Sequence, residues 1–168
     1  MGRQFADLLN ACSRTAFKLE FRDCYMTEDP GYKAWEAGNL DAAIAAYSDS
    51  TGRMHAAIAR GVAIQRVRIV SVPVSSYIVF EHAVTDGVNI AAGELIRWLP
   101  RRYASDLALP GNDAWVFDDQ VVQFGHFAGD GSFLDNEVTE APDAVKLCSS
   151  AFNAAWARAI DHSEFSLT

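Results

Sequence analysis

The stretch Ile64-Gln-Arg66-Val-Arg68-Ile-Val-Ser-Val72 is rich in β-branched residues, and Pro73 follows it directly. Residues of this kind fit the pleated, half-buried surface of a sheet, so the stretch predicts a strand. Side chains two positions apart in a strand project from the same face. We therefore expect Arg66 and Arg68 to stand side by side on one face of a sheet.

The residues after this strand predict a helix and then a second strand. A serine at the start of the segment can cap a helix whose larger side chains are Tyr77, Phe80, Glu81 and Val84. Residues 76–83 also alternate with a period of two, so a strand is the alternative there, although the helix is favoured. A short strand is expected from Glu94 to Leu99, because Pro100 ends it.

From Asp113 onward the apolar pattern has a period of two. Three short strands are expected at 114–117, 121–127 and 133–138, and the Asp and Gly turns between them predict an antiparallel meander. Pro142 then lies at the start of a last helix, whose apolar face comprises Val145, Cys148, Phe152, Trp156 and Ile160.

The first 61 residues show mainly helical patterns. Helices are expected over 3–13, 30–36, 40–47 and 53–60. Between the first two, Phe17, Leu19 and Phe21 alternate with charged residues and predict a half-buried strand.

These elements together predict an α+β fold. A small mixed or antiparallel sheet ends in a carboxy-terminal β-meander, flanked by amino-terminal helices and a long carboxy-terminal helix. A chain of 168 residues has the size of one domain. We expect a single domain over 1–168, in which helix-rich 1–61 packs on an α+β core at 62–168.

Composition excludes several classes of function. Fourteen Lys and Arg residues against 22 Asp and Glu residues give a net charge of −8. Affinity for nucleic acid comes largely from neutralising phosphates, so we expect no direct binding of nucleic acid. No apolar run approaches the ~18 residues of a membrane span, so no membrane association is expected. The three cysteines form no close pair, which favours a reducing cytoplasm.

The sequence also contains no recognisable metal or cofactor motif. No two of the four histidines have the spacing of a metal-binding pair. Neither a phosphate-binding glycine loop, a dinucleotide fingerprint nor a nucleophile elbow occurs. We therefore expect neither a metal nor a cofactor.

A candidate ligand site is centred on three arginines. Arg97 lies on the strand predicted next to the one that carries Arg66 and Arg68. Three neighbouring guanidiniums could clamp a carboxylate or phosphate through paired hydrogen bonds. The alternative is an exposed sheet face with paired surface charges. Trp98 and Trp115 are expected to line the groove beside these arginines.

Glu81 and Glu94 are the carboxylates with the most apolar neighbours in the sequence. A carboxylate in apolar surroundings either pairs with a cation or has a raised pKa that suits general acid–base work. Salt bridges to the arginines and a catalytic role are therefore both open for these two residues.

Three stretches carry a family resemblance: Arg66-Val-Arg-Ile-Val, Ala92-Gly-Glu-Leu-Ile-Arg97 and Asp113-Ala-Trp-Val-Phe-Asp-Asp119. In order and spacing they resemble the R-V-R-V-V, A-G-E-x-I-R and D-F-W-L-F-D-D patterns of an uncharacterised actinobacterial family of domains of unknown function. Ala114 departs from the aromatic residue that is usual there, which leaves space beside Trp115.

Members of that family are often encoded beside helix-turn-helix regulators, so the resemblance implies a regulatory or accessory role. The carboxy-terminal half is also faintly similar to a phospholipase D half-domain. Phosphodiester chemistry of that type would need a His-x-Lys-x4-Asp signature. None of Lys18, Lys33 and Lys146 has a histidine two residues before it.

Two functions are carried forward from the sequence. The first is a non-enzymatic regulatory or accessory domain that binds a helix-turn-helix regulator or a small carboxylated ligand, with a homodimer left open. The second is a small metal-independent enzyme of bacterial specialised metabolism, of lyase or cyclase type. In that enzyme Glu81 or Glu94 is the acid/base, and Arg66, Arg68 or Arg97 holds a substrate carboxylate.

Overall fold

A single mixed sheet occupies the centre of residues 5–167, the part of the chain that this computed structural model describes. Seven strands run across it there, in the order β6-β5-β4-β1-β2-β3-β7. Neighbours β1, β2 and β3 are parallel, and the remaining neighbours are antiparallel. The strands are β1 (Thr15–Glu20), β2 (Ala63–Val70), β3 (Leu95–Pro100), β4 (Asp113–Phe117), β5 (Val121–Phe127), β6 (Phe133–Thr139) and β7 (Ile160–Asp161).

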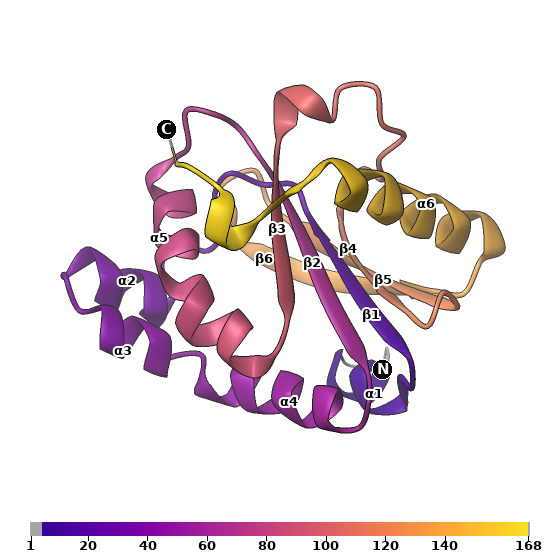
Figure 1. The fold of residues 1–168 in the computed structure, drawn as a ribbon, viewed down its shortest axis with the longest axis horizontal. Helices are drawn as coiled ribbons and strands as arrows, with labels where there is room; N and C mark the ends of the chain where they lie inside the picture. Colours follow the sequence, from indigo (N-terminus) through magenta and orange to yellow (C-terminus); the bar gives the residue numbers. More distant parts are fainter. Residues whose placement is uncertain (1–4, 168) are drawn as a thin grey trace.

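Helices cover both faces of this sheet (Figure 1). The long helix α6 (Pro142–Arg158) lies along one face. The other face is covered by α1 (Phe5–Ala11), α4 (Ser48–Ala59) and α5 (Ser76–Thr85). Helices α2 (Pro30–Glu36) and α3 (Leu40–Ala45) pack against α5 on its side away from the sheet. Shorter turns are the π-helical η1 (Asp86–Ile90) and the 3-10 turns η2 (Arg101–Tyr103) and η3 (His162–Glu164).

Helix α5 begins where its cap predicts. The Ser75 hydroxyl accepts a hydrogen bond from the Ile78 amide at 3.2 Å, which satisfies one of the free donors of the first turn. The strand alternative for residues 76–83 is therefore wrong. The sequence pattern did not predict η1, which continues α5 and contains the buried Asn89.

The face of the sheet beneath α6 is apolar. Leu19, Val67 and Leu99 are fully buried there. Phe17 of β1 stacks on Phe152 of α6, with ring centroids 4.4 Å apart. Such aromatic pairs stabilise beyond the area they bury, so this face forms a conventional core.

The turn between β4 and β5 fixes the start of β1. Asp118 and Asp119 both have positive φ, and the Gln120 amide donates to the Phe117 carbonyl, so these two residues are the central pair of a turn whose twist suits a hairpin. The Asp118 carboxylate accepts hydrogen bonds from the backbone amides of Ser13, Arg14 and Thr15 at 2.8–2.9 Å. These contacts hold the pKa of Asp118 well below its usual range despite the opposing effect of burial.

The predicted α+β class is confirmed, with the three-strand meander and the long last helix close to their expected bounds. The first 61 residues contribute more than helices, because β1 lies at the middle of the sheet between β4 and β2. None of the helices in residues 5–167 is both long enough and apolar enough to span a membrane.

Candidate functional site

A row of charged side chains crosses the middle of the sheet on the face covered by α5. The register of β1 and β2 pairs Lys18 with Arg66 and Glu20 with Arg68. All four side chains project from the same face, since the side-chain period of a strand is two. The row extends onto β4, where the Asp113 carboxylate accepts a hydrogen bond of 2.6 Å from the Tyr25 hydroxyl.

Arg66 lies between two acids. Its Nη1 donates to Oε1 of Glu20 at 2.6 Å, and its Nε and Nη2 lie 3.2 and 3.1 Å from Oε2 of Glu94. The guanidinium also lies over the Trp115 ring, 5.2 Å from its centroid. Most of the hydrogen-bonding capacity of Arg66 is therefore used within the protein.

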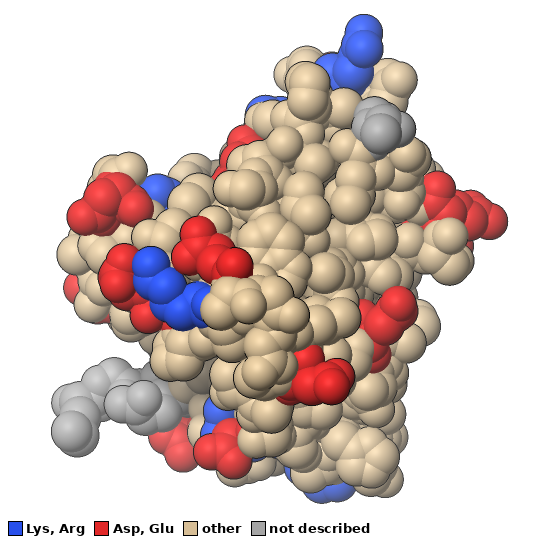
Figure 2. Space-filling model, turned by 90° about the vertical axis from the view of Figure 1, so that its left-hand side faces the viewer, with Lys and Arg blue, Asp and Glu red and all other residues tan. Residues whose placement is uncertain are grey.

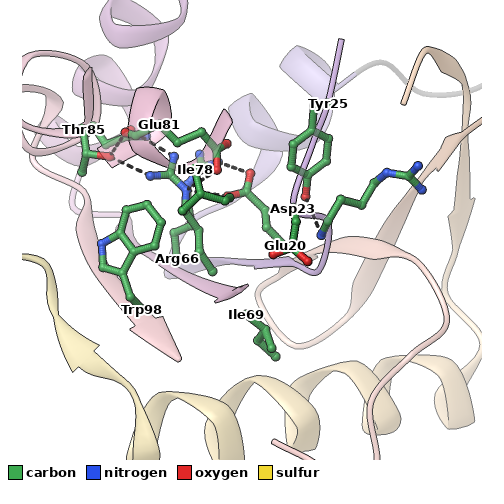
Figure 3. A network of polar contacts seen from close by, with 12 residues as sticks. Glu20, Asp23, Tyr25, Arg66, Ile69, Ile78, Glu81, Thr85 and Trp98 are labelled. Carbon is green, nitrogen blue, oxygen red and sulfur yellow. Dashed lines mark hydrogen bonds and ion pairs between the residues drawn. The ribbon is translucent and has the colours of Figure 1, made fainter. Parts of the chain in front are cut away.

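The network continues from β2 toward Glu81 and Thr85 of α5 (Figure 3), and Arg68 makes the connection. Its Nε donates to Oε2 of Glu20 at 2.9 Å, and its Nη1 donates to Oγ1 of Thr85 at 2.6 Å. The guanidinium lies 4.9 Å from the ring centroid of Trp98. Glu81 approaches from α5, with Oε2 3.8 Å from the Arg68 Nε.

The two acids beside Arg68 differ in their charge behaviour. Burial alone would raise the pKa of Glu20, but the positive charges of Arg66 and Arg68 lower it to about 2. Burial raises the pKa of Glu81 to about 7, because Arg68 offsets it only in part and the negative charge of Glu20 adds to it. Glu20 is thus a permanent anion, whereas Glu81 exchanges a proton near neutral pH.

A cavity of about 170 Å³ opens beside this network. Its walls include Glu20, Arg66, Arg68 and Glu81 on the charged side. Aromatic and apolar side chains line much of the remaining wall: Met26, Tyr47, Tyr77, Phe80, Val84 and Val88. Polar and apolar surfaces therefore meet in one small hollow, as in many ligand pockets.

A larger and more open groove of about 550 Å³ lies next to the cavity. Met26 and Asp29 belong to the walls of both hollows. Asp29 is held in place because its carboxylate caps α2 through the Gly31 amide and accepts a hydrogen bond from the Tyr47 hydroxyl. Among the described residues, the walls of this groove contain acidic side chains but neither Lys nor Arg, so the residues that pair opposite charges line the smaller cavity.

The structure places Arg97 away from the other two arginines, so the expected three-arginine clamp is wrong. Arg97 is in register with Val67 and projects toward α6. Its Nε donates to Asp161 at 2.7 Å, and its guanidinium lies 4.3 Å from the ring centroid of Trp156. The composition of two adjacent strands does not show how their residues are aligned, and this register decides from which face of the sheet each side chain projects.

The other expected site residues lie near the network but not in the cavity wall. Trp98 and Trp115 support the guanidiniums of Arg68 and Arg66, so they do not line a groove. Trp98 also donates from Nε1 to Nδ1 of His162 at 3.0 Å. Both carboxylate oxygens of Glu94 are engaged, by Arg66 and by Asn89, so Glu81 is the one of the two predicted acids that lines the cavity.

Comparison with known families supplies an identity at the family level. The model of a domain of unknown function, DUF6879, matches residues 3–167. The chain belongs to the DUF6879 family. The comparison with curated proteins finds no match.

Solved structures resemble this DUF6879 member in fold. Nuc, a phospholipase D family member from Salmonella typhimurium, superposes with a TM-score of 0.53 at 11% identity, covering 93% of this chain and 86% of that one. NucT from Helicobacter pylori gives a TM-score of 0.51 at 9% identity, covering 93% and 87%. At such low identity the likeness concerns the fold alone.

The catalytic signature expected of phospholipase D chemistry does not accompany this fold in the DUF6879 chain. No lysine is preceded two positions earlier by a histidine. Within residues 5–167 no group of His, Cys, Asp and Glu side chains is arranged to hold a metal ion.

Sequence reasoning assigned Arg66, Arg68 and Glu81 to a site but missed the other residues that line the cavity, among them Glu20, Asp29, Tyr47 and Tyr77. Glu20 alternates with apolar residues, which predicts a solvated face. That face is covered because α5 packs over it, a contact that joins residues far apart in the chain. The usable signal was the alternation of charged residues in both strands, Lys18 and Glu20 in one and Arg66 and Arg68 in the other.

Proposed function

We propose that the protein is a non-enzymatic small-ligand-binding domain with a regulatory or accessory role. The proposed binding site is the cavity between α5 and the strands β1 and β2. The observation that carries the proposal is the placement of the buried Arg66, Arg68 and Glu81, together with the half-buried Glu20, around an open volume of about 170 Å³.

The energetic cost of this arrangement supports a binding role. Removing an ion from water costs several kcal/mol, and a well-packed apolar replacement is often as stable or more stable. A domain that served only as a scaffold would not need four ionisable groups under α5. Their retention beside a hollow is expected if the hollow receives a polar ligand.

The size of the cavity limits the ligand. Pockets for drug-sized molecules measure ~300–1,000 Å³. A cavity of about 170 Å³ therefore fits a small metabolite or one end of a longer molecule that continues into the neighbouring groove. Because Met26 and Asp29 border both hollows, a longer ligand would pass these two residues.

The proposal is tested by a thermal-shift screen with small amines, carboxylates, alcohols and amides, followed by ligand-observed NMR. Ser50 lines the cavity from α4, whereas Ser48 on the same helix is exposed and outside it. We expect Ser50→Phe to block binding by filling the cavity and Ser48→Phe to leave it intact. If no compound binds, or if both variants bind as the unmodified protein does, the proposal is wrong.

The protonation of Glu81 favours a second candidate function, the metal-independent enzyme. A buried carboxyl whose pKa is about 7 is suited to general acid–base catalysis at neutral pH. Each compound that binds would be incubated with the protein in deuterated water and followed by NMR. Conversion, or exchange of a carbon-bound proton that Glu81→Gln abolishes, would favour the enzyme. Unchanged spectra of a bound compound would favour the non-enzymatic domain.

A further inference from the structure

We infer that the ligand of the cavity carries a protonated amine, and that Glu81 is the group that receives it. This inference rests on the proposed binding function and names the chemical class of ligand. It departs from the carboxylated ligand expected from the arginines in the sequence. The charges, the unused hydrogen-bonding groups and the aromatic walls each point to a cation.

The arginines of the cavity are already neutralised. Glu20 bridges them, with its two carboxylate oxygens 2.6 Å from Arg66 and 2.9 Å from Arg68. Arg66 has a further partner in Glu94 at 3.1 Å. An incoming carboxylate would compete with these ion pairs and would meet the charges of three neighbouring acids. An anion clamp built on Arg66 and Arg68 is therefore already occupied by the protein itself.

Glu81, in contrast, has hydrogen-bonding capacity to spare. The side chain is nine-tenths buried and lies in the cavity wall. Within residues 5–167, the contact of its carboxylate is the approach to the Arg68 Nε at 3.8 Å, which exceeds hydrogen-bond length. Figure 3 shows the Glu81 side chain extending from the middle of α5 toward Glu20 and the network. A buried carboxylate without a donor is the group that an ammonium would satisfy.

Aromatic rings complete a cation site. Tyr77 and Phe80 line the cavity with ring centroids 5.4 Å apart, and Tyr47 lies in the same wall. The Tyr77 hydroxyl, on a side chain 7% exposed, has no hydrogen-bond partner within the described residues 5–167, so its oxygen can accept from a ligand. The faces of such rings attract cations within ~6 Å.

The surroundings of the cavity are also acidic. The neighbouring groove is bordered by Glu28, Asp29 and Asp130, and neither Lys nor Arg is among its wall residues. The surface that carries α2, α3 and α5 shows acidic side chains spread more widely than basic ones (Figure 2). Fields of one sign raise the local concentration of the opposite ion, so a cationic ligand would be attracted to this entrance.

The test uses three molecules of similar shape: propylamine, n-propanol and propionate. Their binding to the full chain would be measured by two-dimensional NMR titration at neutral pH. We expect propylamine to bind about tenfold or more tightly than n-propanol, because it gains a charge-assisted hydrogen bond. Propionate should not bind in the cavity. Ser50→Phe should abolish the shifts caused by propylamine.

Two variants separate the role of Glu81 from a general change in charge. Glu81→Gln removes the proposed anion and should bring propylamine to the affinity of n-propanol. Glu164→Gln makes the same change at an exposed position of η3, outside both hollows, and should leave the preference unchanged. Near-ultraviolet circular dichroism would confirm that each variant keeps its fold.

The outcomes distinguish this inference from the function on which it rests. Preference for propylamine that disappears in Glu81→Gln and persists in Glu164→Gln supports the inference. Preferential binding of propionate in the cavity would overturn it while leaving the proposed binding function in place. Equal affinity for all three molecules, or a preference that survives in Glu81→Gln, would also overturn it. If no compound of the broader screen binds either, the proposed function fails as well.

Discussion

Replacing Glu81 by Gln should stabilise the protein at alkaline pH and have little effect at acidic pH. Burial raises the pKa of this carboxyl from 4.5 to about 7, so the folded protein holds a proton that the unfolded chain releases. The contribution of Glu81 is therefore fully favourable below about pH 4.5 and is lost as the pH rises through about 7. Gln resembles the protonated form and lacks this dependence.

The size of the expected stability difference follows from the shift in the pKa of Glu81. Each pKa unit corresponds to about 1.4 kcal/mol, so the advantage of Glu81→Gln should grow by roughly 2–3 kcal/mol between pH 5 and pH 8. Glu20 stays ionised throughout, because its pKa lies at about 2. Burial lowers the pKa of His82 and His162, which opposes the Glu81 effect in this range. Both proteins share these histidines, so their contribution cancels in the difference.

The assay is urea unfolding followed by tryptophan fluorescence at about pH 5, 6, 7 and 8, with the difference in free energy of unfolding plotted against pH. Glu164→Gln serves as the control, since this exposed residue should give a flat line. A difference between Glu81→Gln and the unmodified protein that stays constant with pH would refute the reasoning. It would mean that Glu81 is already ionised and paired in the folded protein.

Three further predictions concern stability, each measured by chemical denaturation. Arg66→Met should lower the free energy of unfolding by about 3–5 kcal/mol, because it leaves buried acids unpaired. Arg97→Met removes a half-exposed ion pair and should lower it by only about 1 kcal/mol. Equal losses in the two variants would contradict the burial argument. Asp118→Asn should lose about 1–3 kcal/mol, because its charge holds three backbone amides, and an unchanged midpoint would count against this role. Gly31→Ala should lose about 1–3 kcal/mol, because the added methyl carbon would lie 2.5 Å from the Tyr47 ring; a neutral result would show that the ring moves freely.

The spacing of apolar residues within single segments was sufficient to predict most of the helices and strands. The β-branched run around Val67, the period of two from Asp113 and the apolar face of residues 145–160 predict β2, the meander and α6 close to their observed bounds. These signals are strong because each lies within one continuous segment and depends on a side-chain period. The two-residue strand β7 and the turn η1 carry no such period and were missed.

The site was predictable only in part. Arg66, Arg68 and Glu81 meet as expected from charged residues in neighbouring apolar segments. Arg97 was placed on the wrong face, because strand register is decided by packing against α6 rather than by composition. Glu20 was read as solvated, since nothing within its own segment shows that α5 will cover it. The missed features all depend on contacts between segments distant in the chain.

The position of β1 bears on how the chain reaches this structure during synthesis. Thr15 pairs with Ala63 on one side, and Phe17 pairs with Val116 on the other. Strand β1 must therefore wait for partners that are synthesised much later, and the middle of the sheet closes only after β4 emerges. Such non-local pairing slows folding and leaves apolar strand edges open in the meantime. Nascent chains should accordingly be clients of holding chaperones until the residues of β4, up to Phe117, have emerged.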